Sequence, residues 1–115
     1  MPRFKELYIR GNDENLRNFH DTIAGTINRN WSFRRDSFLE REFLFFRYSG
    51  DELHPAAEVS LTLKNNGCYY IPNIVPIEKQ ELSVEEYNNM VDFFKQDIVD
   101  PYVTAQPTDI EVEVQ

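Results

Sequence analysis

An alternation of apolar and polar residues over residues 57–64, AEVSLTLK, is the most regular pattern in this chain. Its period of two is that of a strand with one face in the core and the other in water. Asn-Asn-Gly follows at residues 65–67, and these residue types tolerate the positive φ angles of a tight hairpin turn. We therefore predict a β-hairpin whose return strand begins at residues 68–71, where Pro72 and Pro76 limit regular pairing.

Two strands are predicted before the hairpin. Residues 4–10 alternate, but both sets of alternate positions contain apolar side chains, so the pattern does not fix the buried face. Residues 42–48 hold large apolar groups at most positions, which suits a central strand or one covered on both faces. Residues 29–41 and 73–82 lack a clean period. We interpret the first as a connection with a short strand or turn, and the second as a connection that contains proline.

A first helix is predicted to begin after Asn12 or Asp13, either of which can serve as its N-cap. Asp13 and Glu14 also suit the positive end of the helix dipole. Apolar residues then recur at spacings of three, four and four residues, which places them along one face of a helix. They are Leu16, Phe19, Ile23 and Ile27.

A second helix is predicted over residues 84–99. Ser83 and Glu86 have the spacing of a capping box, in which each side chain bonds the other residue's backbone N–H. We expect the helix to end at Asp100, because the residue before a proline, here Pro101, disfavours helical backbone. The apolar stripe consists of Tyr87, Val91, Phe94 and Ile98, widened by Met90 and Phe93.

The order of elements is strand, helix, three strands, helix and a last strand. This order predicts an α+β fold, a small antiparallel sheet with two helices packed on one face; a small curved sheet around the first helix is the alternative. Residues 1–101 are expected to form a single α+β domain. Residues 102–115 are an acidic C-terminal tail or edge strand, since apolar and acidic residues alternate over residues 110–114. We favour the edge strand over a tail that pairs only with a partner's sheet.

The net charge of −8 arises entirely in the last third of the chain. Residues 1–77 hold ten basic and ten acidic residues, whereas residues 78–115 hold two basic and ten acidic residues. Such segregation favours a protein partner with a basic surface and disfavours nucleic acid or an anionic membrane, although solubility alone would also explain it. The first residues lack the apolar region of a secretory signal, and no apolar run has the length of a membrane span.

No motif for catalysis, metal binding or phosphate binding occurs in the sequence, so we expect neither an enzyme nor a cofactor or metal ion. Cys68 is the single cysteine, which excludes an intramolecular disulfide and favours a reducing compartment, the cytoplasm. We interpret Cys68 as inert filler in the sheet rather than as a nucleophile. His20 is interpreted as a partly buried structural histidine, and His54 as an exposed loop residue.

The remaining feature is a segment from Arg29 to Arg47 in which arginines alternate with aromatic residues, Trp31 and Phe33 among them. Salt bridges within the fold, combined with core aromatics, are the simplest interpretation. Contact with a protein is the second, because Trp, Tyr and Arg are enriched at interface hot spots. Binding of single-stranded nucleic acid is the third.

These observations predict a small acidic interaction module that binds and inhibits or regulates another protein, in the manner of an antitoxin, an immunity protein or a phage-encoded inhibitor. A homodimer through an edge strand is also compatible with the pattern. The candidate partner-binding residues are Glu85, Glu86, Asp92 and Asp97 on the second helix, with Trp31 and Arg34 as anchors.

Two alternatives stay open. A small-molecule-binding or enzymatic α+β domain would have a pocket between sheet and helices, and a nucleic-acid binder would use residues 29–47. The pocket of the first alternative would be lined by Tyr69, Tyr70, Tyr87 and His20.

Overall fold

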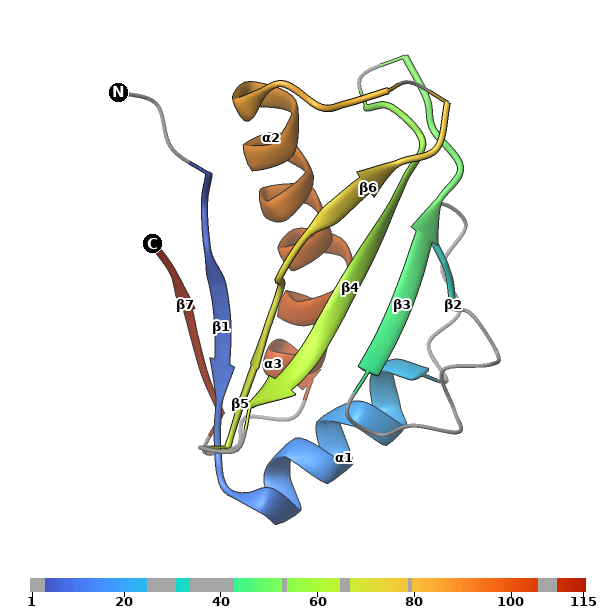
Figure 1. Ribbon diagram of the computed structural model, residues 1–115. Coiled ribbons are helices and arrows are strands. Elements are labelled where there is room, and N and C mark those ends of the chain that lie inside the picture. Colours follow the sequence, from blue (N-terminus) through green and yellow to red (C-terminus); the bar gives the residue numbers. More distant parts are fainter. Residues whose placement is uncertain are drawn as a thin grey trace.

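The computed structural model describes residues 4–24, 31–33, 43–52, 54–64, 67–78, 80–105 and 110–115. Its strands form one antiparallel sheet and its helices cover one face of that sheet, so the predicted α+β architecture is confirmed (Figure 1). The strands are β1 Leu7–Arg10, β2 Trp31–Phe33, β3 Phe43–Tyr48, β4 Ala57–Lys64, β5 Cys68–Tyr70, β6 Ile74–Pro76 and β7 Glu111–Val114. The helical segments are α1 Asp13–Ala24, α2 Val84–Phe94, the π-helical turn η2 Lys95–Val99 and α3 Asp100–Ala105.

The sheet has the strand order β2-β3-β4-β5-β1-β7, and β6 pairs with β4 beside this path. The predicted hairpin is β4–β5, in which Thr62 lies opposite Tyr70. Its turn contains Gly67 at a φ of +76°, a left-handed conformation that favours glycine. β3 pairs with a strand on either side, β2 and β4, although it lies next to the edge of the sheet. It is not covered equally on both faces, because Phe46 is buried whereas Arg47 is exposed.

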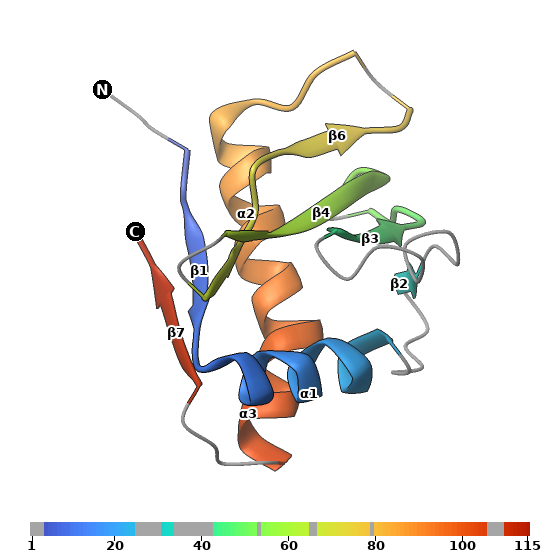
Figure 2. The same cartoon turned by 60° about the horizontal axis from the view of Figure 1, so that its bottom comes forward.

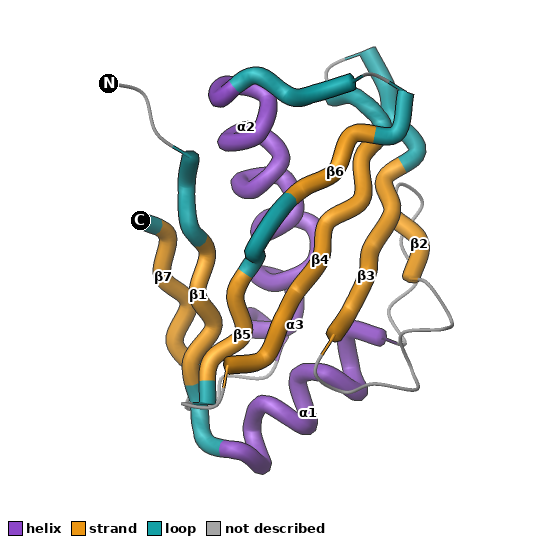
Figure 3. The backbone as a smooth tube through the Cα atoms, in the orientation of Figure 1, coloured by secondary structure: helices purple, strands orange, loops and turns teal. Residues whose placement is uncertain are grey.

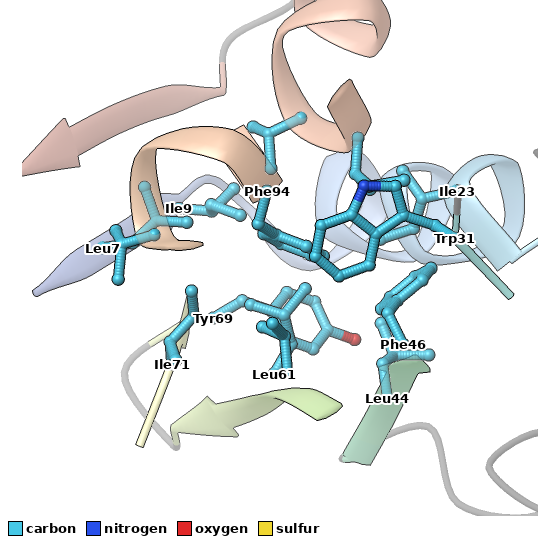
Figure 4. Close-up of a cluster of buried hydrophobic side chains, with 14 of the residues drawn as sticks. Leu7, Ile9, Ile23, Trp31, Leu44, Phe46, Leu61, Tyr69, Ile71 and Phe94 are labelled. Atoms are coloured by element: carbon cyan, nitrogen blue, oxygen red, sulfur yellow. The ribbon is translucent and has the colours of Figure 1, made fainter. Parts of the chain in front are cut away.

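The hydrophobic core lies between the sheet and the helices (Figure 4). Ile23 of α1 and Phe94 of α2 point into the same cluster as Leu44 and Leu61 of the sheet. The apolar stripe predicted for the second helix is confirmed, because its main positions are all buried: Tyr87, Val91, Phe94 and Ile98. Of the two residues that widen it, Met90 is buried and Phe93 is partly buried. In β1 the buried set is Leu7 and Ile9, which settles the face that the sequence pattern left open.

Both predicted helix starts are confirmed. The Oδ1 atom of Asn12 accepts a hydrogen bond from the backbone N–H of Asn15 over 2.7 Å. The capping box of α2 has both of its hydrogen bonds, because Ser83 Oγ accepts from the N–H of Glu86 and Glu86 Oε1 accepts from the N–H of Ser83. These side chains satisfy backbone donors that lack a partner within the helix.

The second helix does not end at Asp100, and the prediction of its end was wrong. α2 continues through η2 into α3, and in the π turn the N–H of Asp100 donates to the carbonyl of Lys95, five residues back. This turn is wider than an α-helical turn. It lies directly before Pro101, and a proline inside a regular α-helix clashes with the carbonyl of the residue four positions earlier.

The segment after residue 101 is built into the same core and sheet as the rest of the described chain. Tyr102 is buried, and its hydroxyl accepts a hydrogen bond from Asn18 of α1, which crosses α3 (Figure 2). Ile110 is also buried, and β7 pairs with β1 as the last strand of the sheet. No helix in the described ranges is long and apolar enough to span a membrane.

A candidate binding groove between β1 and β6

The sheet splits next to β5 because the strand that continues from it carries an extra residue. Thr62 of β4 pairs with Tyr70, and Val59 of β4 pairs with Ile74. Two residues of β4 lie between these pairs, whereas three residues, 71–73, lie between them on the other strand. The second strand thus has one extra residue, which is a β-bulge. A β-bulge bends its strand and increases the local twist.

The bulge carries β6 away from β1. The ladder between β1 and β5 begins at Tyr8 opposite Tyr70, and no strand of the described part pairs with the same edge of β1 between Phe4 and Leu7. Figure 3 shows the chain turning away from β1 between β5 and β6, with α2 behind the opening. The sheet therefore presents two strand edges that face each other.

A groove of about 700 Å³ occupies this opening. Tyr87 of α2 lines it and is in edge-to-face contact with Phe4, with ring centroids 4.7 Å apart. Phe4 and Val75 on its walls are 51% and 52% exposed, and Ile77 directly after β6 is 44% exposed. These three are the large apolar side chains that the described part of the chain exposes most. The groove thus combines apolar surface with two strand edges.

The alternation of backbone groups shows what each edge offers. Ile77 N–H donates to the carbonyl of Ala56, so in β6 it is Ile74 and Pro76 whose backbone groups face away from β4. Pro76 has no N–H, which leaves Ile74 as the donor on that edge. Across the groove, Glu6 bonds Gln115 of the C-terminal strand with both its N–H and its C=O.

By the same alternation, Lys5 and Leu7 of the β1 edge direct their backbone groups toward the groove. The N–H of Lys5 is already bound by Asn88 Oδ1 of α2 at 2.7 Å. Beside Lys5, the backbone groups directed toward the groove are those of Leu7 on one wall and of Ile74 and Pro76 on the other.

A cluster of tyrosine and basic side chains lies at one end of the groove. The rings of Tyr8 and Tyr70 are stacked at 6.5 Å with an interplanar angle of 19°. Lys64 Nζ lies 4.3 Å from the centre of the Tyr70 ring and 5.6 Å from that of Tyr8. The hydroxyl of Tyr8 donates to Glu6 over 3.0 Å, and this hydrogen bond raises the pKa of the Tyr8 phenol.

The groups expected for a catalytic pocket do not converge here. Tyr70 and Tyr87 line the groove, but Tyr69 is fully buried in the core, and His20 lies in α1 outside the groove. His20 is buried, with Nδ1 2.9 Å from Asp21 and, within the described residues, no partner for Nε2. Cys68 is buried and its Sγ donates to the Tyr69 carbonyl. The described residues contain no cluster of His, Cys, Asp and Glu able to hold a metal ion.

Of the acidic residues proposed for partner binding, three have structural partners. Glu86 belongs to the capping box, Asp92 forms an ion pair with Lys5 at 2.6 Å, and Asp97 accepts a hydrogen bond from Trp31. Glu85 is exposed in the first turn of α2. These acids therefore do not form one free surface.

The structure places one of the two proposed anchors, Trp31, and does not describe the other, Arg34. Trp31 is 5% exposed and belongs to the core, so it is not available to a partner. Arg34 lies outside the described residues, as do Arg29, Arg35 and Arg41 of the arginine-rich segment.

Arg47, the last arginine of that segment, pairs with Glu58 at 3.6 Å. His54 is half-buried, and its ring stacks on that of Phe93 with ring centroids 4.4 Å apart.

The sequence pattern did not point to the groove as such. Its walls come from segments that are far apart in the chain, and a strand as short as β6 with a terminal proline gives no periodic signal. Phe4 was an indication of the groove, because it belongs to residues 4–10, where the alternation did not fix the buried face. Comparisons with protein-family models, with curated proteins and with solved structures found no match.

Proposed function

We propose that this protein is a non-enzymatic interaction module that binds an extended segment of a partner protein in the groove between β1 and β6. The observation that carries the proposal is the pair of facing strand edges beside two exposed apolar side chains of the groove lining, Phe4 and Val75. A peptide that enters such a split adds main-chain hydrogen bonds to the sheet and buries apolar surface at the same time.

Side chains rather than backbone would supply most of the selectivity. Pro76 removes a donor from the β6 edge, and Asn88 occupies the N–H of Lys5. Prolines on open edges protect sheets against indiscriminate strand pairing. A bound segment would therefore be selected by how its alternate side chains pack against Phe4 and Val75.

The lining of the groove carries charges of both signs. Glu6 and Glu81 are its acidic residues, and Lys64 and Lys5, which is paired with Asp92, are its basic residues. Binding would inhibit or regulate the partner by covering the segment held in the groove. The cytoplasm is the proposed location, on the ground of the single cysteine.

Peptide selection tests this proposal. Random decapeptides displayed on phage, in formats with internal and with free carboxyl-terminal peptides, would be selected on the immobilised protein. Binding of the enriched peptides is then measured by fluorescence anisotropy with wild type and with Val75→Lys, which places a charge on the groove wall. We expect at least a tenfold weaker affinity for Val75→Lys.

Thr104→Lys is the matched control. Thr104 is exposed on α3, so this substitution introduces the same charge away from the groove. It should bind like wild type. Urea unfolding of all three proteins verifies that they are folded. If no enriched peptide distinguishes Val75→Lys from Thr104→Lys, the groove is not the binding site and the proposal fails.

A further inference from the structure

We infer that the groove receives the carboxyl-terminal end of its partner and that Lys64 binds the terminal carboxylate. This inference rests on the proposed function, because it specifies which part of a partner protein enters the groove. It follows from the shape of the groove and from the partners of the described lysine and arginine residues.

The groove is closed at one end. The β1–β5 ladder begins at the pair Tyr8 and Tyr70, so a strand added between β1 and β6 meets paired backbone at this point (Figure 3). Such a strand must either stop there or leave the plane of the sheet. The opposite end, near Phe4 and Glu81, has no such closure in the described part of the chain. A chain terminus fits a closed end of this kind better than a continuing strand does.

The ammonium group at the closed end favours a carboxyl terminus over an amino terminus. Lys64 lines the groove there, and its ammonium group is held over the rings of Tyr70 and Tyr8. Among the lysine and arginine residues of the described ranges, Lys64 is the one without a carboxylate within ion-pair distance. The others are paired as Lys5–Asp92, Arg10–Glu113, Arg17–Asp13, Arg47–Glu58 and Lys95–Asp100.

The remaining charges predict the composition of the bound segment. Glu6 and Glu81 also line the groove, and the Glu6 carboxylate already accepts a hydrogen bond from Tyr8 beside the closed end. A peptide with a free carboxylate for Lys64 and neutral or basic residues before it matches these charges. Single-stranded nucleic acid matches them poorly, because its phosphates would repeat along the two glutamates.

The decisive measurement compares the enriched peptides as free acids and as carboxamides. We expect the carboxamide to bind wild type at least tenfold more weakly. Lys64→Gln should weaken the free acid to a similar degree and leave the carboxamide nearly unchanged, since the ammonium and the carboxylate act on each other. Lys64→Arg should retain most of the affinity, and Lys95→Gln, which removes a cation outside the groove, should match wild type.

The outcomes separate this inference from the proposed function. Equal binding of the acid and the carboxamide, with affinity still lost in Val75→Lys, means that an internal segment occupies the groove and overturns the inference alone. If an oligothymidylate displaces the peptide, binds more tightly than the peptide and depends on Lys64, the groove binds nucleic acid and the inference fails. If the peptides bind Val75→Lys as tightly as wild type, the proposed function and the inference both fail.

Discussion

Trp31 Nε1 donates a hydrogen bond to Oδ2 of Asp97 over 3.1 Å, and this contact joins β2 to the π-helical turn η2 across 66 residues of sequence. The indole also packs against Phe93 and Phe94, with ring centroids 5.6 and 5.4 Å away. Two residues that the sequence marks as candidates for partner contact are therefore bound to each other inside the fold. Their role in the folded protein is structural.

Asp97→Ala is expected to destabilise the protein by about 1–3 kcal/mol, because it leaves the buried indole N–H of Trp31 without an acceptor. Asp97→Asn keeps an acceptor oxygen and should cost less. The measurement is the free energy of unfolding in urea. Asp92→Ala is the control, since it removes an exposed ion pair with Lys5 whose contribution is about 0–1 kcal/mol. Equal losses for the two alanine variants would contradict the structural role.

Ser83→Ala should cost about 0.5–2 kcal/mol, because it removes the acceptor that satisfies the Glu86 N–H at the start of α2. Glu86→Ala removes the reciprocal bond and should also destabilise, whereas Glu85→Ala removes an exposed side chain and should not. Thermal and urea unfolding measure all three. Stability losses that are the same for Glu85→Ala and Glu86→Ala would exclude a specific capping function for Glu86.

The phenol of Tyr48 gives the protein a pH dependence at the alkaline end. Burial, followed by the hydrogen bond to Asp51, raises the pKa of Tyr48 from 10.0 to about 12. Because the unfolded chain ionises first, the contribution of Tyr48 to stability is fully present below pH 10.0 and is lost as the pH rises toward about 12. Tyr48→Phe should therefore show a smaller loss of unfolding free energy over this interval than wild type.

Tyr8→Phe provides the matched comparison. The pKa of Tyr8 is also raised, by its hydrogen bond to Glu6, but its side chain is not in the core. Urea unfolding at several pH values from about 9 to about 12 measures the slopes, because this range spans the unfolded and the folded pKa of Tyr48. If Tyr48→Phe and wild type lose stability in parallel, the phenol of Tyr48 does not titrate as inferred.

Local patterns fixed the elements that depend on local chemistry. The β4–β5 hairpin follows from alternation and an Asn-Asn-Gly turn, and the start of α2 follows from Ser83 and Glu86, all close in sequence. The end of the helix was missed because a π turn accommodates Pro101, and hydrophobic periodicity carries no information about a switch from α to π turns. β6 was missed because a strand of three residues has no measurable period.

The groove was beyond sequence reasoning for a different reason. It exists because one extra residue in 71–73 separates β6 from β1, and whether an extra residue forms a bulge depends on the pairing partner. Its charged end likewise combines Tyr8, Lys64 and Tyr70 from three strands. Their proximity is a property of the register, which the sequence pattern of any one strand does not contain.

β7 is the last strand of the sheet, and its open edge is where the edge-strand homodimer that is compatible with the sequence would form. β7 carries Glu111 and Glu113, which are exposed. Antiparallel pairing of two copies about Val112 would place Glu111 of one copy opposite Glu113 of the other, and like charges in this position are destabilising. Hydrogen bonds from Gln115 and Arg10 lower the pKa of Glu113, so its charge is retained at neutral pH.

We therefore predict that wild type is monomeric at neutral pH and that the double variant Glu111→Thr, Glu113→Thr forms dimers as its concentration rises. Threonine removes both charges and favours strand conformation, which leaves the edge free to pair. Size-exclusion chromatography with light scattering measures the mass. The double variant Glu78→Thr, Glu85→Thr changes the net charge equally but away from β7, and it should stay monomeric. Dimers of both variants would show that net charge, not the glutamates on the edge, prevents association.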